Sequence, residues 1–185
     1  MEKKIQTIGT LNTASFSVHL DEVLLRDGKP GKRIKMDHPE AAAIIPFVAD
    51  DEILMVRQFR YALGRETLEI PAGKLDPGEN LEACVKRELL EETGNEAGKI
   101  TFIVTFAPAI GYSNELIHIY SAHQLRKTQE DIDEREISSV ERLGLREIQG
   151  MIEKGLIMDG KTLLALCLTG LITLGSKPPV GSLRL

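Results

Sequence analysis

One segment constrains the fold of this chain more than any other: residues 73–94, with the sequence GKLDPGENLEACVKRELLEETG. Asn80 can cap the start of a helix with its side-chain oxygen, and Gly94 can end it in the left-handed conformation. At about 100° per residue, the apolar side chains gather on one side of this helix, and Glu88 and Glu92 fall among them. Because the apolar side packs on a core, both carboxylates are predicted to point inward.

Inward-pointing acids need a partner. Like charges at i and i+4 cost about 0.2–0.5 kcal/mol when exposed, and more when water is withdrawn. Divalent cations take carboxylate oxygens and keep places for phosphate oxygens, which favours a metal site for a phosphate-bearing substrate. Glu91 lies at the edge of this site, and Arg87, one turn earlier, is placed to hold its carboxylate. The alternative is a surface helix with i,i+4 ion pairs, but Leu81 and Leu89 fix which side faces inward.

The same segment resembles the Nudix box. Its pattern of Gly, five residues, Glu, seven residues, Arg-Glu-Leu, one residue, Glu-Glu, one residue and Gly fills every fixed position. Asn95 is a departure, because the family has an apolar residue there. The resemblance implies an α/β fold, a Nudix-type α/β/α sandwich with a mixed sheet, and it makes the Ala72 carbonyl a metal ligand. The ligand set is then Ala72, Glu88, Glu91 and Glu92, with Mg²⁺ as the ion and Mn²⁺ as the alternative.

Residues 57–79, RQFRYALGRETLEIPAGKLDPGE, resemble the segment that leads into the box in ADP-ribose pyrophosphatases. There the residue that matches Arg60 contacts the substrate, and Arg57 and Arg65 are weaker candidates. Arginine suits this role because its guanidinium pairs with phosphate through two hydrogen bonds. The alternative is an exposed strand edge whose arginines extend into water.

Residues 107–115 form a turn-rich loop, which is a natural place for function. The loop keeps Gly111 and Glu115 of the related enzymes, and both are predicted to bind substrate. Ile110 stands where that branch has a diagnostic proline, so a different nucleotide sugar stays open as the substrate. Glu115 has the alternative of simply beginning the next strand.

The acidic residues 130–136 precede a predicted strand at 137–143. Such a run is usually a solvated loop. In the enzymes that this chain resembles, however, an acid-rich loop at this place closes over the substrate and provides the base that activates water. Glu136 matches that base best and Glu134 second, because Glu136 directly precedes the strand.

The chain divides into an N-terminal β unit at 1–38, a Nudix hydrolase domain at 39–177 and a C-terminal tail at 178–185. The N-terminal unit is antiparallel and too small to bury much by itself, so it should lean on the main domain or on another copy. The resemblance implies a homodimer in which this unit contributes to the substrate pocket. Strands are predicted at 16–21, 32–36, 41–48, 53–56, 100–106 and 116–122, and helices at 81–93, 144–154 and 162–174.

Composition agrees with one soluble domain, or with one domain and a small appendage, since 185 residues with 42% hydrophobic content suffice for a sizeable core. A net charge of −5 without a basic patch disfavours nucleic acid as a partner. The longest apolar run, residues 162–175, is too short to cross a bilayer of about 30 Å. Cys84 and Cys167 read as core thiols in a reducing compartment, so the protein is predicted to be cytoplasmic without a membrane partner.

The predicted reaction is hydrolysis of the pyrophosphate bond of a nucleoside diphosphate sugar, with ADP-ribose giving AMP and ribose 5-phosphate. Glu136 would take the proton of the attacking water, and Arg60 would position the diphosphate. One alternative is a hydrolase of another nucleotide sugar, a GDP- or ADP-hexose. The other is a Nudix-like sensor that binds such a ligand without cleaving it.

Overall fold

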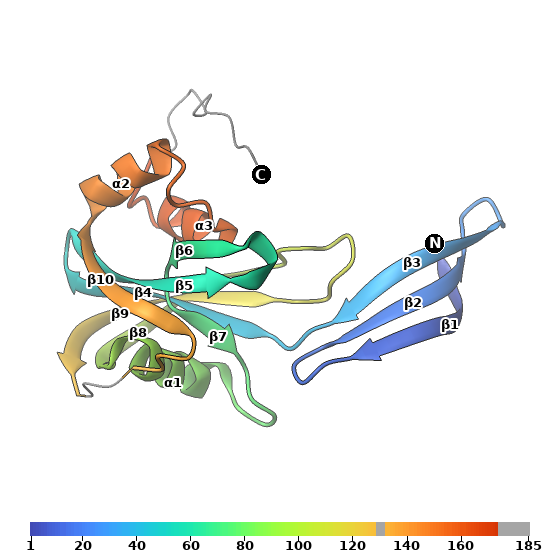
Figure 1. The fold of residues 1–185 in the computed structure, drawn as a ribbon, viewed down its shortest axis with the longest axis horizontal. Helices are drawn as coiled ribbons and strands as arrows, with labels where there is room; N and C mark the ends of the chain where they lie inside the picture. Colours follow the sequence, from blue (N-terminus) through green and yellow to red (C-terminus); the bar gives the residue numbers. More distant parts are fainter. Residues whose placement is uncertain (129–131, 174–185) are drawn as a thin grey trace.

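The computed structural model describes residues 1–128 and 132–173. A small N-terminal sheet projects from a larger α/β body, as Figure 1 shows. The predicted tail at 178–185 lies outside the described residues, as do the first residues of the acidic segment. In the part of the chain that is described, no helix has the length and apolar character needed to cross a membrane.

The larger body is built on one mixed sheet of seven strands. They are β4 (Ala41–Ala49), β5 (Glu52–Arg60), β6 (Arg65–Glu69), β7 (Ala72–Lys74), β8 (Asn95–Phe106), β9 (Ile117–Lys127) and β10 (Ile137–Gly144). The order is β10-β5-β4-β9-β8, with β6 beside β5 and β7 beside β4. Only β4 and β9 run parallel among these described pairs. A short 3₁₀ turn, Tyr61–Leu63, links β5 to β6.

Helices cover both faces of this sheet (Figure 1): α1 (Leu81–Thr93) on one, and α2 (Leu145–Glu153) and α3 (Gly160–Leu168) on the other. The central strand β4 is apolar on both sides because both sides are covered. Ala42 and Ile44 pack toward α1, whereas Ala43 and Ile45 pack toward α2 and α3. The predicted α/β/α sandwich with a mixed sheet is confirmed.

The ends of α1 are those that the sequence predicts. Asn80 Oδ1 accepts a hydrogen bond from the Ala83 N–H at 2.9 Å, and Gly94 ends the helix with φ 69°. Glu88 and Glu92 are buried, at 8% and 4% exposure, on the side that packs against the sheet. The predicted inward orientation of both acids is therefore confirmed.

Several elements differ from the prediction: β5 and β9 run further, to Arg60 and Lys127, and β6 and β7 were not expected. Two further differences have a local cause. β8 begins at Asn95 rather than at residue 100, because the left-handed Gly94 turns the chain directly into the strand. Asn95 Nδ2 also donates to the Thr93 carbonyl at 2.8 Å, so the polar residue there closes the helix end. The last helix runs from Gly160 to Leu168 instead of 162–174, since Asp159 caps it early and Gly170 leaves it with φ 70°.

The N-terminal sheet is antiparallel with the order β1 (Lys3–Asn12), β2 (Ser17–Leu24) and β3 (Pro30–Asp37). The predicted antiparallel unit is confirmed, and β1 is an addition to the two strands expected from the sequence. The end of β3 is attached to the 107–115 loop. The Met36 N–H donates to the Tyr112 carbonyl at 2.6 Å, and the Asn114 N–H donates to the Met36 carbonyl at 3.2 Å. These two bonds join the N-terminal sheet to the loop predicted to bind substrate.

Candidate active site

Side chains from α1, from β5 and from the start of α3 line one open cleft of about 960 Å³. The loops before β9 and β10 contribute to its rim. Among its lining residues are the predicted site residues Arg60, Ala72, Arg87, Glu88, Glu91, Glu92, Glu115 and Glu136. The fold therefore gathers most of the sequence candidates in one place.

Glu92 lies deepest among the acids of the box helix. Its Oε2 accepts a hydrogen bond from the Ala72 N–H at 3.0 Å, which ties the carboxylate to β7. Burial, together with the charge of Glu88, raises the pKa of Glu92 to about 8. Without a cation, this carboxyl is costly to keep charged at neutral pH.

Glu88 lies against the backbone of β7. A Cβ atom built on Gly73 would come within 1.8 Å of Glu88 Oε1, so only glycine leaves room for this carboxylate. Burial raises the pKa of Glu88, and the charges of Glu91 and Glu136 act in the same direction. The acids of the cleft are thus close enough to repel one another.

Arg87 joins the acids of the box. Its Nη1 donates to Glu88 at 2.7 Å and to Glu91 at 3.1 Å, while Nε and Nη2 donate to Glu79 at 2.9 and 2.8 Å. A further bond runs from Nη2 to the Lys74 carbonyl at 3.0 Å. These bonds from Arg87 are the main reason why the pKa of Glu79 is lowered to about 2. Arg87 fixes α1 to the preceding loop and orients two of the predicted ligands.

The donor set at this place suits a hard divalent cation. It offers two buried carboxylates, a third exposed carboxylate and the neighbouring Ala72 carbonyl, all of them oxygen donors. Within the described residues, no three His, Cys, Asp or Glu side chains stand in a ready metal-binding arrangement. Instead, the guanidinium of Arg87 pairs with the carboxylates of Glu88 and Glu91 and supplies positive charge beside them. The chemistry of the donors fits the predicted Mg²⁺ or Mn²⁺.

Comparisons with known proteins agree with this geometry. The model of the NUDIX domain matches residues 37–165. The chain belongs to the Nudix family. It is 35% identical over 167 residues to the ADP-ribose pyrophosphatase of Bacillus subtilis (strain 168), covering 89% of this chain and 90% of that protein. The predicted resemblance to Nudix hydrolases of the ADP-ribose pyrophosphatase branch is confirmed.

Other relatives carry other names. The methanol dehydrogenase activator of Bacillus methanolicus is 36% identical over 89% of this chain and 90% of its own length. The GDP-mannose pyrophosphatase of Citrobacter koseri is 34% identical over 73% of this chain and 75% of its own length. The crystal structure of an ADP compounds hydrolase has a TM-score of 0.76 at 24% identity, and the match covers 91% of this chain and 92% of that one. That structural similarity establishes the Nudix fold.

Arg60 lines the cleft of this Nudix fold, but the sequence did not indicate that its guanidinium is bonded to Glu69. Its Nε and Nη2 donate to the two carboxylate oxygens of Glu69 at 2.8 and 2.5 Å. Glu69 also accepts bonds from Thr67 and Lys161. Burial pushes the pKa of Glu69 upward, but the bond from Arg60 and the charge of Lys161 outweigh it and lower the pKa to about 2. Arg60 is therefore engaged with a protein carboxylate inside the cleft.

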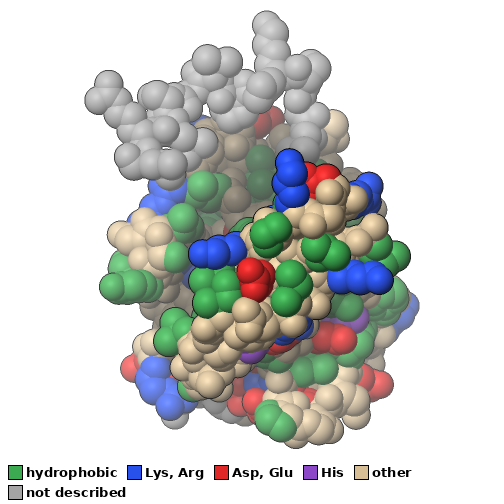
Figure 2. Space-filling model, turned by 90° about the vertical axis from the view of Figure 1, so that its right-hand side faces the viewer, with side chains coloured by type: hydrophobic (Ala, Val, Ile, Leu, Met, Phe, Trp, Pro, Cys, Tyr) green, Lys and Arg blue, Asp and Glu red, His purple; other side chains and the backbone are tan. Residues whose placement is uncertain are grey.

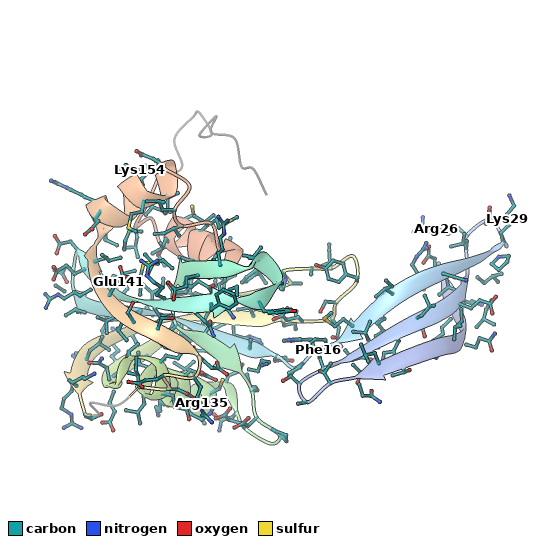
Figure 3. The ribbon with its side chains drawn as sticks, viewed as in Figure 1. Phe16, Arg26, Lys29, Arg135, Glu141 and Lys154 are labelled. Atoms are coloured by element: carbon teal, nitrogen blue, oxygen red, sulfur yellow. The ribbon has the colours of Figure 1, made fainter. Side chains whose placement is uncertain are left out.

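Four candidates, Arg57, Arg65, Gly111 and Glu134, lie outside the lining of the described cleft. Arg57 and Arg60 are three residues apart in an extended strand, so their side chains point to opposite faces. Arg57 accordingly pairs with Glu141, Nε to Oε1 at 2.8 Å, and does not line the cleft. Gly111 and Glu134 are exposed in loops and are likewise outside the lining of the described cleft. Figure 3 shows Glu141 on β10, well apart from Arg135 in the loop that precedes this strand.

Several lining residues were missed by the sequence interpretation. Asp133 joins the loop before β10 to the box helix, because its N–H donates to the Glu91 carbonyl at 2.9 Å. This bond holds the neighbouring Glu136 at the rim of the cleft. Asp159 and Lys161 come from the start of α3. A capping residue before an apolar helix was visible in the sequence at Asp159, but the contact of Lys161 with Glu69 was not.

His38 lines the cleft at the rim nearest the N-terminal sheet, and its ring packs against Phe16. The rings of Phe16 and His38 have their centroids 5.6 Å apart, and His38 Nδ1 lies 3.5 Å from Glu115 Oε1. Phe16 sits at the end of the N-terminal sheet that faces the main body (Figure 3). Glu115 thus meets a residue of the segment that links the two sheets, while its role toward substrate stays a prediction.

Proposed function

We propose that this Nudix protein hydrolyses the pyrophosphate bond of a nucleoside diphosphate sugar, with ADP-ribose as substrate and AMP and ribose 5-phosphate as products. The observation that carries the proposal is that the acids of the box, Arg60 and Glu136 all line the same cleft. The relatives named ADP-ribose pyrophosphatase and GDP-mannose pyrophosphatase support this substrate class.

In this proposal, Glu88, Glu91, Glu92 and the Ala72 carbonyl hold Mg²⁺, with Mn²⁺ as the alternative. When bound, the ion supplies neutralisation of the diphosphate and a lower pKa for water next to it. The proposal also includes a cytoplasmic location.

The remaining chemistry belongs to the side chains. Glu136 is exposed at the rim, where it accepts the proton of the water that attacks phosphorus. Arg60 binds the diphosphate through its planar guanidinium and stabilises the charge that develops on it. Arg87 keeps Glu91 and Glu88 in place throughout. Glu115 faces the substrate from the other side of the cleft.

A panel of substrates tests this function. Hydrolysis of ADP-ribose, ADP-glucose, GDP-mannose and NADH is measured with purified protein and Mg²⁺, and ADP-ribose is expected to give the highest kcat/KM. A higher value for GDP-mannose would favour the second candidate, which the GDP-mannose pyrophosphatase relative and the exposed Ile110 in place of proline support. Tight binding of ADP-ribose with no turnover in either Mg²⁺ or Mn²⁺ would contradict the enzyme and indicate a sensor.

The proposal includes a homodimer formed through residues 1–38, with residues 39–177 as the hydrolase domain. Leu20 and Ile34 lie directly opposite each other on β2 and β3, so their side chains share one face of the N-terminal sheet. Leu24 extends this face, and Leu11 is paired with Val18 on it. Leu11 is 64% and Ile34 57% exposed, and Figure 2 shows hydrophobic side chains at the surface of this end of the molecule. A second copy of the same face is the occupant that matches this apolar surface.

A charge on this face should separate the dimer. Ile34→Glu is expected to raise the dissociation constant of the dimer by roughly 10²-fold or more, because burying an unpaired carboxylate costs several kcal/mol. Sedimentation equilibrium at micromolar concentration measures the effect. Lys35→Glu, the next residue on β3, points to the opposite face and serves as the control with a wild-type dissociation constant. A wild-type protein that is monomeric at these concentrations would contradict the proposed dimer.

A further inference from the structure

The contacts around Glu69 assign a function to Lys161 that rests on the function proposed above. We propose that Lys161 is a positioning residue that releases Arg60 to the diphosphate of the substrate. It does so by keeping its own positively charged ammonium group beside the Glu69 carboxylate when Arg60 leaves. Lys161 lines the cleft, and its side chain is only 9% exposed.

The bonds to Glu69 are divided between its two oxygens. Oε1 accepts from Arg60 Nε at 2.8 Å and from Thr67 Oγ1 at 2.5 Å. Oε2 accepts from Arg60 Nη2 at 2.5 Å and from Lys161 Nζ. If Arg60 turns toward a ligand, each oxygen of this buried carboxylate therefore keeps one donor. The donor that Oε2 keeps is the charged ammonium group of Lys161.

The start of α3 fixes Lys161 in this position. Asp159 Oδ2 accepts from the Thr162 N–H at 3.0 Å and from Lys161 Nζ at 2.9 Å. Thr162 is fully buried, and its Oγ1 accepts from the Ile70 N–H at 3.0 Å, next to Glu69 in the chain. Lys161 is thus held between two carboxylates by a helix start that is itself bonded to the strand end carrying Glu69.

Charge balance explains why this arrangement assists binding. Arg60 and Lys161 together face Glu69 and Asp159, so these four side chains carry no net charge. A phosphate group that draws Arg60 away would leave a buried carboxylate without a cation if Lys161 were missing. Arg60 would then remain on Glu69, and the ligand would lose its contact. With Lys161 present, Arg60 is free to exchange partners.

Affinity for a non-hydrolysable ligand tests this role. Binding of an ADP-ribose analogue with a methylene bridge between its phosphorus atoms is measured by titration calorimetry in Mg²⁺. Lys161→Gln is expected to weaken binding about tenfold, while Lys161→Arg, which keeps the cation, stays within about threefold of the wild type. Lys154→Gln, far from the cleft at the end of α2, is the control and should match the wild type.

A double variant separates this role from two others. In Glu69→Gln with Lys161→Gln, no carboxylate retains Arg60, so affinity should return to within about threefold of the wild type. A residue that bound the ligand directly would show no such recovery, and thermal unfolding of each variant identifies one that only stabilised the fold. Wild-type affinity in the single Gln variant, or no recovery in the double variant, would overturn the proposal. If the single variant does not fold, the Arg variant and the double variant decide the question.

The analogue also distinguishes the two proposals. If the wild type binds the analogue but does not hydrolyse ADP-ribose, the proposed function fails, and the affinities of the variants still decide the role of Lys161. If the wild type does not bind the analogue, Arg60 has no diphosphate to receive, and both proposals are overturned.

Discussion

Glu92→Gln is expected to lower kcat for ADP-ribose by roughly 10²–10³-fold, with KM within about threefold of the wild type. Glutamine has the volume of glutamate. Its side-chain oxygen can still accept the hydrogen bond that the Ala72 N–H donates to Glu92 Oε2 at 3.0 Å. Glutamine offers a neutral amide oxygen in place of an anionic carboxylate oxygen, which holds a divalent cation more strongly. The loss should therefore fall on the chemical step, as steady-state kinetics at saturating Mg²⁺ measures.

The stability of the variant separates this effect from misfolding. Glu92 is 4% exposed, and its charge is opposed by burial and by Glu88. Removing that charge should leave the metal-free protein at least as stable as the wild type, as thermal unfolding in chelator measures. Glu82→Gln is the matched control, because Glu82 lies on the exposed side of the same helix and pairs with Lys86 at 2.6 Å. Turnover of the Glu92 variant near the wild-type rate would refute the assigned ligand.

The sequence was sufficient to predict the box helix, because all the residues that determine where it begins, ends and packs lie within one segment. The cap at Asn80, the left-handed Gly94 and the apolar side are read within one segment, and their geometry follows from helix periodicity. The same periodicity places Glu88 and Glu92 inside. Central strand β4 was equally predictable, since a strand covered on both sides must be apolar throughout.

Contacts between distant segments could not be predicted in this way. Lys161 meets Glu69 across 92 positions of the chain, and no pattern near either residue indicates the contact. The N-terminal strand β1 is exposed along its whole length, so it lacks the alternation of buried and exposed residues that marks a strand. The position of Arg57, by contrast, was predictable: the two-residue period of a strand alone places its side chain on the face opposite to that of Arg60.

Gly73→Ala should lower kcat for ADP-ribose by roughly 10²-fold while changing the free energy of unfolding by about 1 kcal/mol or less. The added Cβ would lie 1.8 Å from Glu88 Oε1, which belongs to the end of a flexible side chain. The carboxylate can therefore swing away at small cost to the fold, but it leaves its place beside β7. The variant is measured by steady-state kinetics and by denaturant unfolding.

A double-mutant cycle makes the cause specific. If Gly73→Ala acts through the position of Glu88, it should add less than about twofold to the loss of activity in Glu88→Gln, because both changes affect one carboxylate. Gly150→Ala in α2 is the control, since an added Cβ there meets nothing within 4 Å and alanine favours the helix. Losses that simply multiply in the double variant would show that Gly73 is required for another reason. Equal activity of Gly73→Ala and the wild type would mean that Glu88 works from a position other than the one it takes against β7.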